Sequence, residues 1–353
     1  MEVQNCPLLK GLVSSASSND HDDVSNIQFF SKVKFDRLTK LVVGECVEVE
    51  RNWHQFPIDL FAGLYELGVS GFKEMKGLFS LPMTQSGCLL QLEKLEISNC
   101  EIMEQIILWN EEESQKNIHI TPFPKLKLLI LDSLPRLTSI VEFSLPEKLE
   151  IRNCPLLLES LVSTSISPTG PPHDDDDSRH LFCKPNKVEF GNLKKLSIGN
   201  YDSMRNWCGQ ISIDFFAVLG KLEVSSLKGM KSLFPCSIAR NLRNLIKLRI
   251  RDCEEMVKVI EDEEDDALQI SLFPNLKLVE LWNLKKLKSF CEWRCTLQLP
   301  KVEDLSIYNC DVMDKFTLGA LNTPNLKGIY IDTHYSGNEV NKALQQQRRL
   351  KRE

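Results

Sequence analysis

The feature that most constrains this chain is that its sequence repeats itself. The segment Leu67–Phe79 reappears as Leu222–Phe234, and Arg51-Asn52-Trp53 reappears as Arg205-Asn206-Trp207, so two blocks of about 150 residues carry the same motifs in the same order. In repeat proteins each unit packs only against its neighbours, and one core is extended from unit to unit. The 353 residues are therefore expected to form a repeat array.

A shorter unit recurs inside both blocks. It reads Leu-x-x-Leu-x-Ile/Val/Leu-x-x-Cys/Leu, as in Leu92, Leu95, Ile97 and Cys100, which is the strand signature of a leucine-rich repeat. Alternate residues of a strand point to opposite faces, so Leu95 and Ile97 are expected to face the core. We predict eleven strands of this kind, at Leu41, Leu67, Leu95, Leu129, Leu149, Leu196, Leu222, Leu248, Val279, Leu305 and Ile329.

The predicted fold is an α/β-type repeat solenoid, a leucine-rich-repeat horseshoe with a parallel concave β-sheet and an irregular convex side. Apolar residues after each strand recur every three positions, which suits short 3₁₀-like or extended turns better than an α-helix. We expect the solenoid to occupy residues 1–335, as duplicated blocks at about 1–153 and 154–310, with a polar surface loop at 163–187. Residues 336–353 are expected to form a capping helix or a tail.

The cysteines follow the repeat. Reduced cysteine is commonly buried as a small apolar residue, so we interpret six of the twelve as an inward-facing ladder in a reducing compartment. Cys291 and Cys295 are the one closely spaced pair, and no further Cys or His cluster of zinc-like spacing accompanies them. No metal site is expected. The ladder comprises Cys6, Cys46, Cys100, Cys154, Cys253 and Cys310.

Charge and motifs indicate a binding protein. The net charge of -6 argues against a nucleic-acid or anionic-membrane binder, whose affinity depends on a surplus of cations. The most apolar window is too short to span a bilayer. Phosphate-binding loops, dinucleotide-binding glycines and the common hydrolase motifs are absent from the sequence. We therefore expect no enzymatic activity, no cofactor, no nucleic-acid partner and no integral membrane segment.

The concave strand surface is the expected recognition face, because it presents side chains on a rigid backbone. A row of cations there is suited to an acidic partner surface, although the neighbouring Glu96, Glu150 and Glu223 also fit a solvated mixed-charge face. Three aromatic residues on successive strands are candidate anchors, unless they pack only against one another. The candidate partner-binding residues are Lys40, Lys94, Lys148, Lys195, Lys221, Lys247, Arg249, Arg251, Trp282, Tyr308 and Tyr330.

A resemblance to a known family rests on these repeats. The pattern Leu-Glu-Lys-Leu-Glu-Ile-Ser-Asn-Cys100-Glu-Ile-Met-Glu-Gln-Ile-Ile is followed by an acidic loop and by Phe-Pro-Lys-Leu-Lys-Leu-Leu-Ile-Leu-Asp-Ser-Leu-Pro-Arg-Leu, and the second block repeats it from Leu245 to Leu287. This resembles the C-terminal repeats of plant coiled-coil nucleotide-binding leucine-rich-repeat disease resistance proteins. The likeness covers nearly the whole chain.

The resemblance implies an intracellular immune receptor. Its repeats would sense a pathogen effector or a guarded host protein and restrain a nucleotide-binding module that switches between ADP and ATP. The implied location is the cytoplasm, with the nucleus or a membrane surface as further possibilities. This sequence contains no coiled-coil region and no phosphate-binding module, so nucleotide binding is not carried over to any of its residues.

The start of the chain suggests truncation. Met1-Glu-Val-Gln-Asn-Cys-Pro-Leu-Leu9 matches Leu149-Glu-Ile-Arg-Asn-Cys-Pro-Leu-Leu157 and so begins within a strand. We expect an array that has lost its upstream part, and poor solubility of the recombinant chain because its first core edge lacks a cap. The alternative function is a substrate adaptor of a ubiquitin ligase, for which an F-box region should precede the repeats.

Overall fold

The computed structural model describes residues 2–4, 38–56, 58–108, 122–140, 146–157, 192–202, 218–261, 269–332, 334–337 and 339–350. These residues belong to two compact units, the first ending at residue 157 and the second beginning at residue 192. The predicted surface loop 163–187 and Cys6 lie outside the described residues.

The first unit is built on a parallel sheet. Leu41, Leu67, Leu95, Leu129 and Leu149 are register partners on successive strands, so equivalent residues of each repeat stack beside one another. All five are buried. In order across the sheet, the described strands are β1 (Glu2–Gln4), β2 (Lys40–Gly44), β3 (Glu66–Ser70), β5 (Lys94–Ser98), β7 (Leu128–Asp132) and β8 (Lys148–Arg152).

The second unit continues the same pattern with one addition. Leu196, Leu222, Leu248, Val279 and Leu305 are buried register partners. The described parallel strands are β9 (Lys195–Tyr201), β10 (Lys221–Leu227), β11 (Lys247–Arg251), β13 (Leu278–Trp282), β15 (Asp304–Tyr308) and β17 (Gly328–Ile331). The short strand β18 (His334–Ser336) pairs antiparallel with β17. The eleven predicted strands are thus confirmed, whereas β18 was not predicted.

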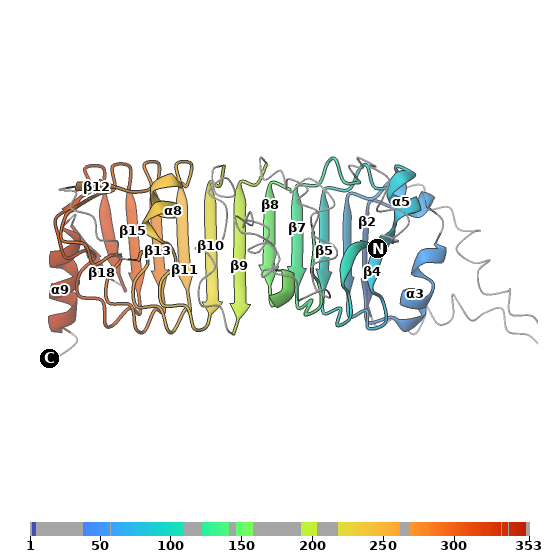
Figure 1. Ribbon diagram of the computed structural model, residues 1–353, viewed down its shortest axis with the longest axis horizontal. Coiled ribbons are helices and arrows are strands. Elements are labelled where there is room, and N and C mark those ends of the chain that lie inside the picture. The colour runs from blue at the N-terminus through green and yellow to red at the C-terminus, as the bar shows by residue number, and fades with distance from the viewer. Residues whose placement is uncertain are drawn as a thin grey trace, which may run out of the picture. The chain divides into compact units, whose positions relative to one another are not determined.

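The segments between the sheet strands are irregular, as predicted for the convex side. In the first unit they contain α3 (Val47–Arg51), η1 (Trp53–Gln55), α4 (Asp59–Ala62), β4 (Gly77–Ser80), α5 (Leu81–Gln85) and β6 (Gln105–Leu108). In the second unit they contain α8 (Cys236–Asn241), β12 (Gln269–Ser271), β14 (Thr296–Gln298) and β16 (Leu321–Asn322). The short strands β12, β14 and β16 pair in parallel, as do β4 and β6. Figure 1 labels α3, β4, α5, α8 and β12 among these elements.

The core of each unit holds phenylalanine rings in contact and free thiols. In the second unit, the rings of Phe273 and Phe290 have centroids 6.3 Å apart, and those of Phe290 and Phe316 are stacked at 4.5 Å. The predicted cysteine ladder is buried at its five described positions. The ladder thiols donate hydrogen bonds to backbone carbonyls; the Sγ of Cys100, for example, donates to the carbonyl of Ser98 at 3.3 Å. Equivalent bonds are made by Cys154, Cys253 and Cys310.

The parallel sheet strands from β2 to β17 each carry a left-handed residue at their C-terminal end or directly after it. Asn99, for example, has φ 54°, and its backbone N–H donates to the carbonyl of Asp132 on the next strand at 2.9 Å. Asn and Gly tolerate this conformation best, which explains why the position before the ladder cysteine is so often Asn. In or next to these described strands, the positive φ occurs at Glu45, Gly71, Asn99, Ser133, Asn153, Asn200, Ser226, Asp252, Asn283, Asn309 and Asp332.

The C-terminal end of the second unit is capped. Helix α9 (Val340–Leu350) buries Val340, Ala343 and Leu344 and contacts β17, and it lies at the end of the array in Figure 1. The Asn341 side chain accepts a hydrogen bond from the Phe316 N–H at 2.7 Å and donates to the Thr317 carbonyl at 3.2 Å. It thereby replaces the backbone groups that a further repeat would supply.

Candidate functional site

The predicted recognition residues lie on what we call the outer face. This is the set of side chains at the first, third and fifth positions of the sheet strands, which point away from the core. The alternation is clear on β11, where Leu248 and Ile250 are buried while Lys247, Arg249 and Arg251 are half-buried. All eleven predicted partner-binding residues occupy such positions. Their packing with one another differs between the two units.

The predicted row of lysines is contiguous in the second unit. Lys195, Lys221 and Lys247 are register partners on β9, β10 and β11. In the first unit the same row is interrupted, because Glu66 lies between Lys40 and Lys94. Lys148 is paired in register with Leu128. A continuous basic edge is therefore a property of the second unit.

Two carboxylates neutralise part of the basic surface in the second unit. Glu223 contacts Lys195 at 3.4 Å and Arg249 at 3.3 Å. Glu280 contacts Lys247 at 3.0 Å and Arg249 at 2.5 Å. The guanidinium of Arg249 thus bridges carboxylates on the strands at either side of it. This arrangement supports the mixed-charge interpretation for these five side chains.

The electrostatics of Glu280 reflect this bridge. Burial by itself raises the pKa of Glu280, but hydrogen bonds from Arg249 and Lys247 outweigh it, and the pKa lies below its ordinary value. The same hydrogen bond raises the pKa of Arg249. Both groups are therefore charged at neutral pH, and the bridge is a fixed part of the outer face.

Most candidate cations of the first unit are also paired. Lys40 contacts Glu66 at 3.1 Å, and Lys94 contacts Glu96 at 2.9 Å. Among the described residues, Lys148, Lys221 and Arg251 are the candidate cations for which the structure gives no ion pair. The sequence alone did not separate these three from the rest, because the partner of a cation depends on the register of the neighbouring strand.

The three candidate aromatic residues divide into two sites. Trp282 and Tyr308 are register partners, with ring centroids 4.3 Å apart and an interplanar angle of 34°. Both are half-buried, so for these two residues the structure agrees with the alternative that the aromatic side chains pack against one another. Tyr330, which is 43% exposed, is aligned with Ser306 and lies beside Tyr335, at 5.3 Å between centroids.

Sequence reasoning missed two contributors to this surface. Glu280 occupies the third, outward position of β13. A charged residue at such a strand position is the signal from which it could have been found. Tyr335 lies on β18, where the repeat pattern ends. Its ring covers Gly328, where a Cβ atom would collide with it, and its hydroxyl donates to the carbonyl of Lys327 at 2.8 Å.

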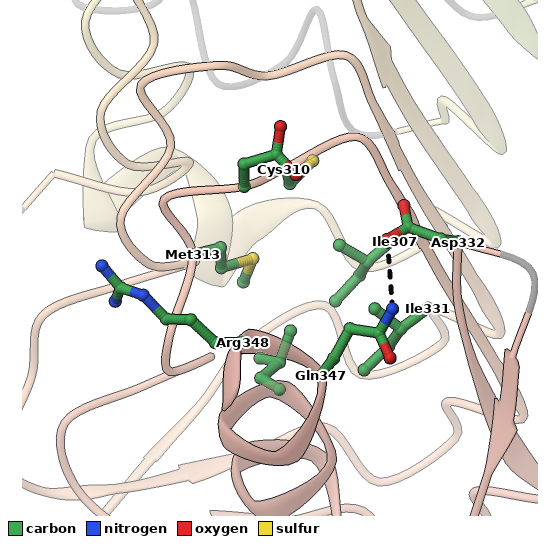
Figure 2. Close-up of a pocket in the computed structure, with 9 residues that line it drawn as sticks. Ile307, Cys310, Met313, Ile331, Asp332, Gln347 and Arg348 are labelled. Atoms are coloured by element: carbon green, nitrogen blue, oxygen red, sulfur yellow. Dashed lines mark hydrogen bonds between the residues drawn. The ribbon is translucent and has the colours of Figure 1, made fainter. Parts of the chain in front are cut away.

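A small cavity lies at the C-terminal end of the second unit. The cavity drawn in Figure 2 lies between β15, β17 and α9, and its volume of about 20 Å³ fits about one water molecule. Gln347 donates to Asp332 across it at 3.5 Å.

Across the ranges that the structure covers, no group of three or more His, Cys, Asp or Glu side chains is arranged to hold a metal ion. Within those same ranges, none of the helices is both long and apolar enough to traverse a bilayer.

Comparison with known families matches most of the chain. The model of the leucine-rich repeats of plant disease resistance proteins of the RPS2-like type matches residues 47–168 and 190–321. The two matches correspond to the two duplicated blocks, and they confirm the resemblance drawn from the repeat sequence. No curated protein and no solved structure matches the chain.

Proposed function

The chain belongs to the leucine-rich-repeat family of RPS2-like plant disease resistance proteins, and from this premise we propose that its outer face recognises another protein in plant immunity. Leucine-rich repeats of this family are protein-recognition scaffolds. The proposed partner is a pathogen effector, a host protein that is guarded against effectors, or the nucleotide-binding module of a resistance protein. The proposed activity is binding without catalysis and without a cofactor.

The observation that carries this proposal is the outer face itself. Its side chains project from parallel strands held in register by main-chain hydrogen bonds, so their spacing is fixed before a partner arrives. Preorganised side chains lose little conformational entropy on binding. Half-buried aromatic and arginine side chains, such as Trp282, Tyr308 and Arg251, are also the residue types that contribute most to protein interfaces.

We propose the cytoplasm as the site of this recognition. Nine cysteines of the described residues are free thiols, and eight of them are buried. Such a set of reduced thiols is typical of a reducing compartment. The proposal can be checked by fractionating plant tissue that expresses the tagged full chain. Recovery of the chain from the secreted fluid would contradict it.

Proximity labelling in infected leaves tests the recognition function. The full chain fused to a biotin ligase is compared with a variant that carries Tyr308→Ala and Tyr330→Ala, and with the control Leu318→Ala, which changes an exposed residue just before β16. We expect at least one protein to be labelled by the wild type and the control but not by the double variant. Binding of that purified protein is then measured by calorimetry. The same labelling pattern for all three chains would contradict the proposal.

A further inference from the structure

The outer face of the second unit carries a local surplus of positive charge. The outward positions of β9, β10, β11 and β13 hold five cations and two carboxylates, a surplus of three charges on a chain whose net charge is -6. Asp304 lies on the next strand, β15, and Asp332 directly follows β17, so the surplus is confined to these four strands. The residues concerned are Lys195, Lys221, Lys247, Arg249, Arg251, Glu223 and Glu280.

The first unit lacks this surplus. The outward positions of its strands β2, β3, β5, β7 and β8 hold four cations and four carboxylates in the described residues. The outer face of the first unit is thus electrically balanced, although its sequence has the same lysines at the same repeat positions. These residues are Lys40, Lys94, Lys148, Arg152, Glu66, Glu96, Asp132 and Glu150.

Two cations in the second unit are left over after internal pairing. Lys195, Lys247 and Arg249 share Glu223 and Glu280. Lys221 and Arg251 have no carboxylate partner among the described residues. Arg251 is aligned with Ser225, four residues beyond Lys221 on the neighbouring strand, so the two positions are separated by roughly 13 Å along the strands.

Two buried hydrogen-bond donors, one on Arg251 and one on Trp282, have no acceptor among the described residues. The guanidinium carbon of Arg251 lies 5.0 Å from the ring centroid of Trp282. Arg251 Nε and Trp282 Nε1 are two of four buried side-chain nitrogen or oxygen atoms in the described residues that have no hydrogen-bond partner. A buried donor without an acceptor is unfavourable, so these two side chains gain hydrogen bonds if they turn on binding toward the oxygen atoms of a partner.

We propose that the outer face of β9, β10, β11 and β13 binds an extended acidic segment of a partner protein. One carboxylate meets Lys221, a second about four residues away meets Arg251, and an apolar side chain packs on Trp282 and Tyr308. The proposal rests on the recognition function above and adds the chemistry of the partner. Glu223 and Glu280 are both aligned with Arg249, at a level along the strands between Lys221 and Arg251, so a continuous polyanion would place phosphates against these carboxylates, which disfavours nucleic acid.

A peptide-binding measurement tests this proposal on the full chain. The probe is fluorescein-labelled Gly-Glu-Gly-Phe-Gly-Glu-Gly, and the matched probe has Gln in place of both Glu residues. Fluorescence anisotropy at low ionic strength is expected to give at least about tenfold tighter binding of the Glu probe. Equal binding of the two probes overturns the proposal.

Variants locate the binding to the second unit. Lys221→Gln with Arg251→Gln is expected to abolish the preference for the Glu probe, whereas the control Lys148→Gln with Arg152→Gln in the first unit keeps it. The exposed Lys221→Gln change is also made alone, so that the test survives if the double variant folds poorly; it is expected to weaken binding about threefold or more. If the single Lys221→Gln variant and the double variant both keep the wild-type preference for the Glu probe, the proposal is overturned.

Two further outcomes separate the alternatives. Displacement of the Glu probe by single-stranded oligothymidylate at equal concentration shows a general polyanion site and overturns the proposal. The other outcome is a protein partner, identified by proximity labelling, that binds the Lys221 and Arg251 variants as tightly as it binds the wild type. That result overturns the acidic-segment proposal alone, and the recognition function stands.

Discussion

The guanidinium carbon of Arg251 lies 5.0 Å from the centroid of the Trp282 ring. The two residues are register partners on β11 and β13, so the stacking of repeats creates a cation–π pair between residues that are distant in sequence. Such a pair stabilises by about 0.5–1 kcal/mol at partly exposed sites. It also holds Arg251 beside the aromatic surface on which we propose a partner packs.

A double-mutant cycle measures this pair. Arg251→Gln and Trp282→Leu, made singly and together, are expected to give a coupling of about 0.5–1 kcal/mol in the free energy of unfolding by urea. The control cycle uses Lys221→Gln with Trp282→Leu, because β10 and β13 are not adjacent. Equal coupling in the two cycles would show that Arg251 and Trp282 do not interact specifically.

Acid should weaken the bridge at Glu280. Its folded pKa lies below the ordinary value of 4.5, so the charged carboxylate contributes stability above that pH, and the contribution is lost as the pH falls through the folded pKa. Glu280→Gln should therefore destabilise the protein at about pH 6, with a difference from wild type that shrinks toward about pH 3. Thermal melting at a series of pH values checks this, and a constant difference contradicts it.

Glu303 provides a contrast to Glu280. Hydrogen bonds from Lys327 and Lys277 lower the pKa of Glu303 to about 2, and its side chain is more exposed than that of Glu280, at 27% against 15%. Because water and salt screen exposed ion pairs, we expect Glu303→Gln to cause a smaller loss of stability that disappears in about 1 M salt. A loss as large and as salt-resistant as that of Glu280→Gln would contradict the role given to burial.

How much of this could be predicted from the sequence depends on the element. The strand containing Leu95 and Ile97 was predictable, because alternation and repeat spacing fix which residues face the core. The ion pairs of Arg249 were not, since they depend on which strands are adjacent and on side-chain rotamers. The position of Tyr330 was predicted on the outer face but not beside Tyr335, because β18 reverses direction and leaves the repeat pattern.

Native alkylation should spare the cysteine ladder. Burial raises the pKa of Cys100 and Cys253 to about 11 and that of Cys154 to about 12. The reactive thiolate is therefore scarce at about pH 8. Mass spectrometry after brief treatment with iodoacetamide should find these three thiols unmodified, while the half-buried Cys295 is modified. Equal modification of all four would show that the ladder is not held inside the fold.

The left-handed turn at Asn99 predicts a clear order of substitutions. With φ of 54°, Asn99→Gly should be nearly neutral, and Asn99→Val should reduce the free energy of unfolding by about 1–2 kcal/mol. The neighbouring Ser98→Val is the control, because this outward strand position accepts a β-branched residue. Urea unfolding measures all three, and a tolerated Asn99→Val would contradict the backbone account.

The central claim is that the outer face of the second unit is the recognition surface. Hydroxyl-radical footprinting of the full chain, alone and with the protein partner found by proximity labelling, tests this most directly. We predict slower oxidation of Trp282, Tyr308 and Tyr330 in the complex, with no change at Leu318 just before β16. Protection of Leu318 with unchanged oxidation of the three aromatic side chains would contradict the account.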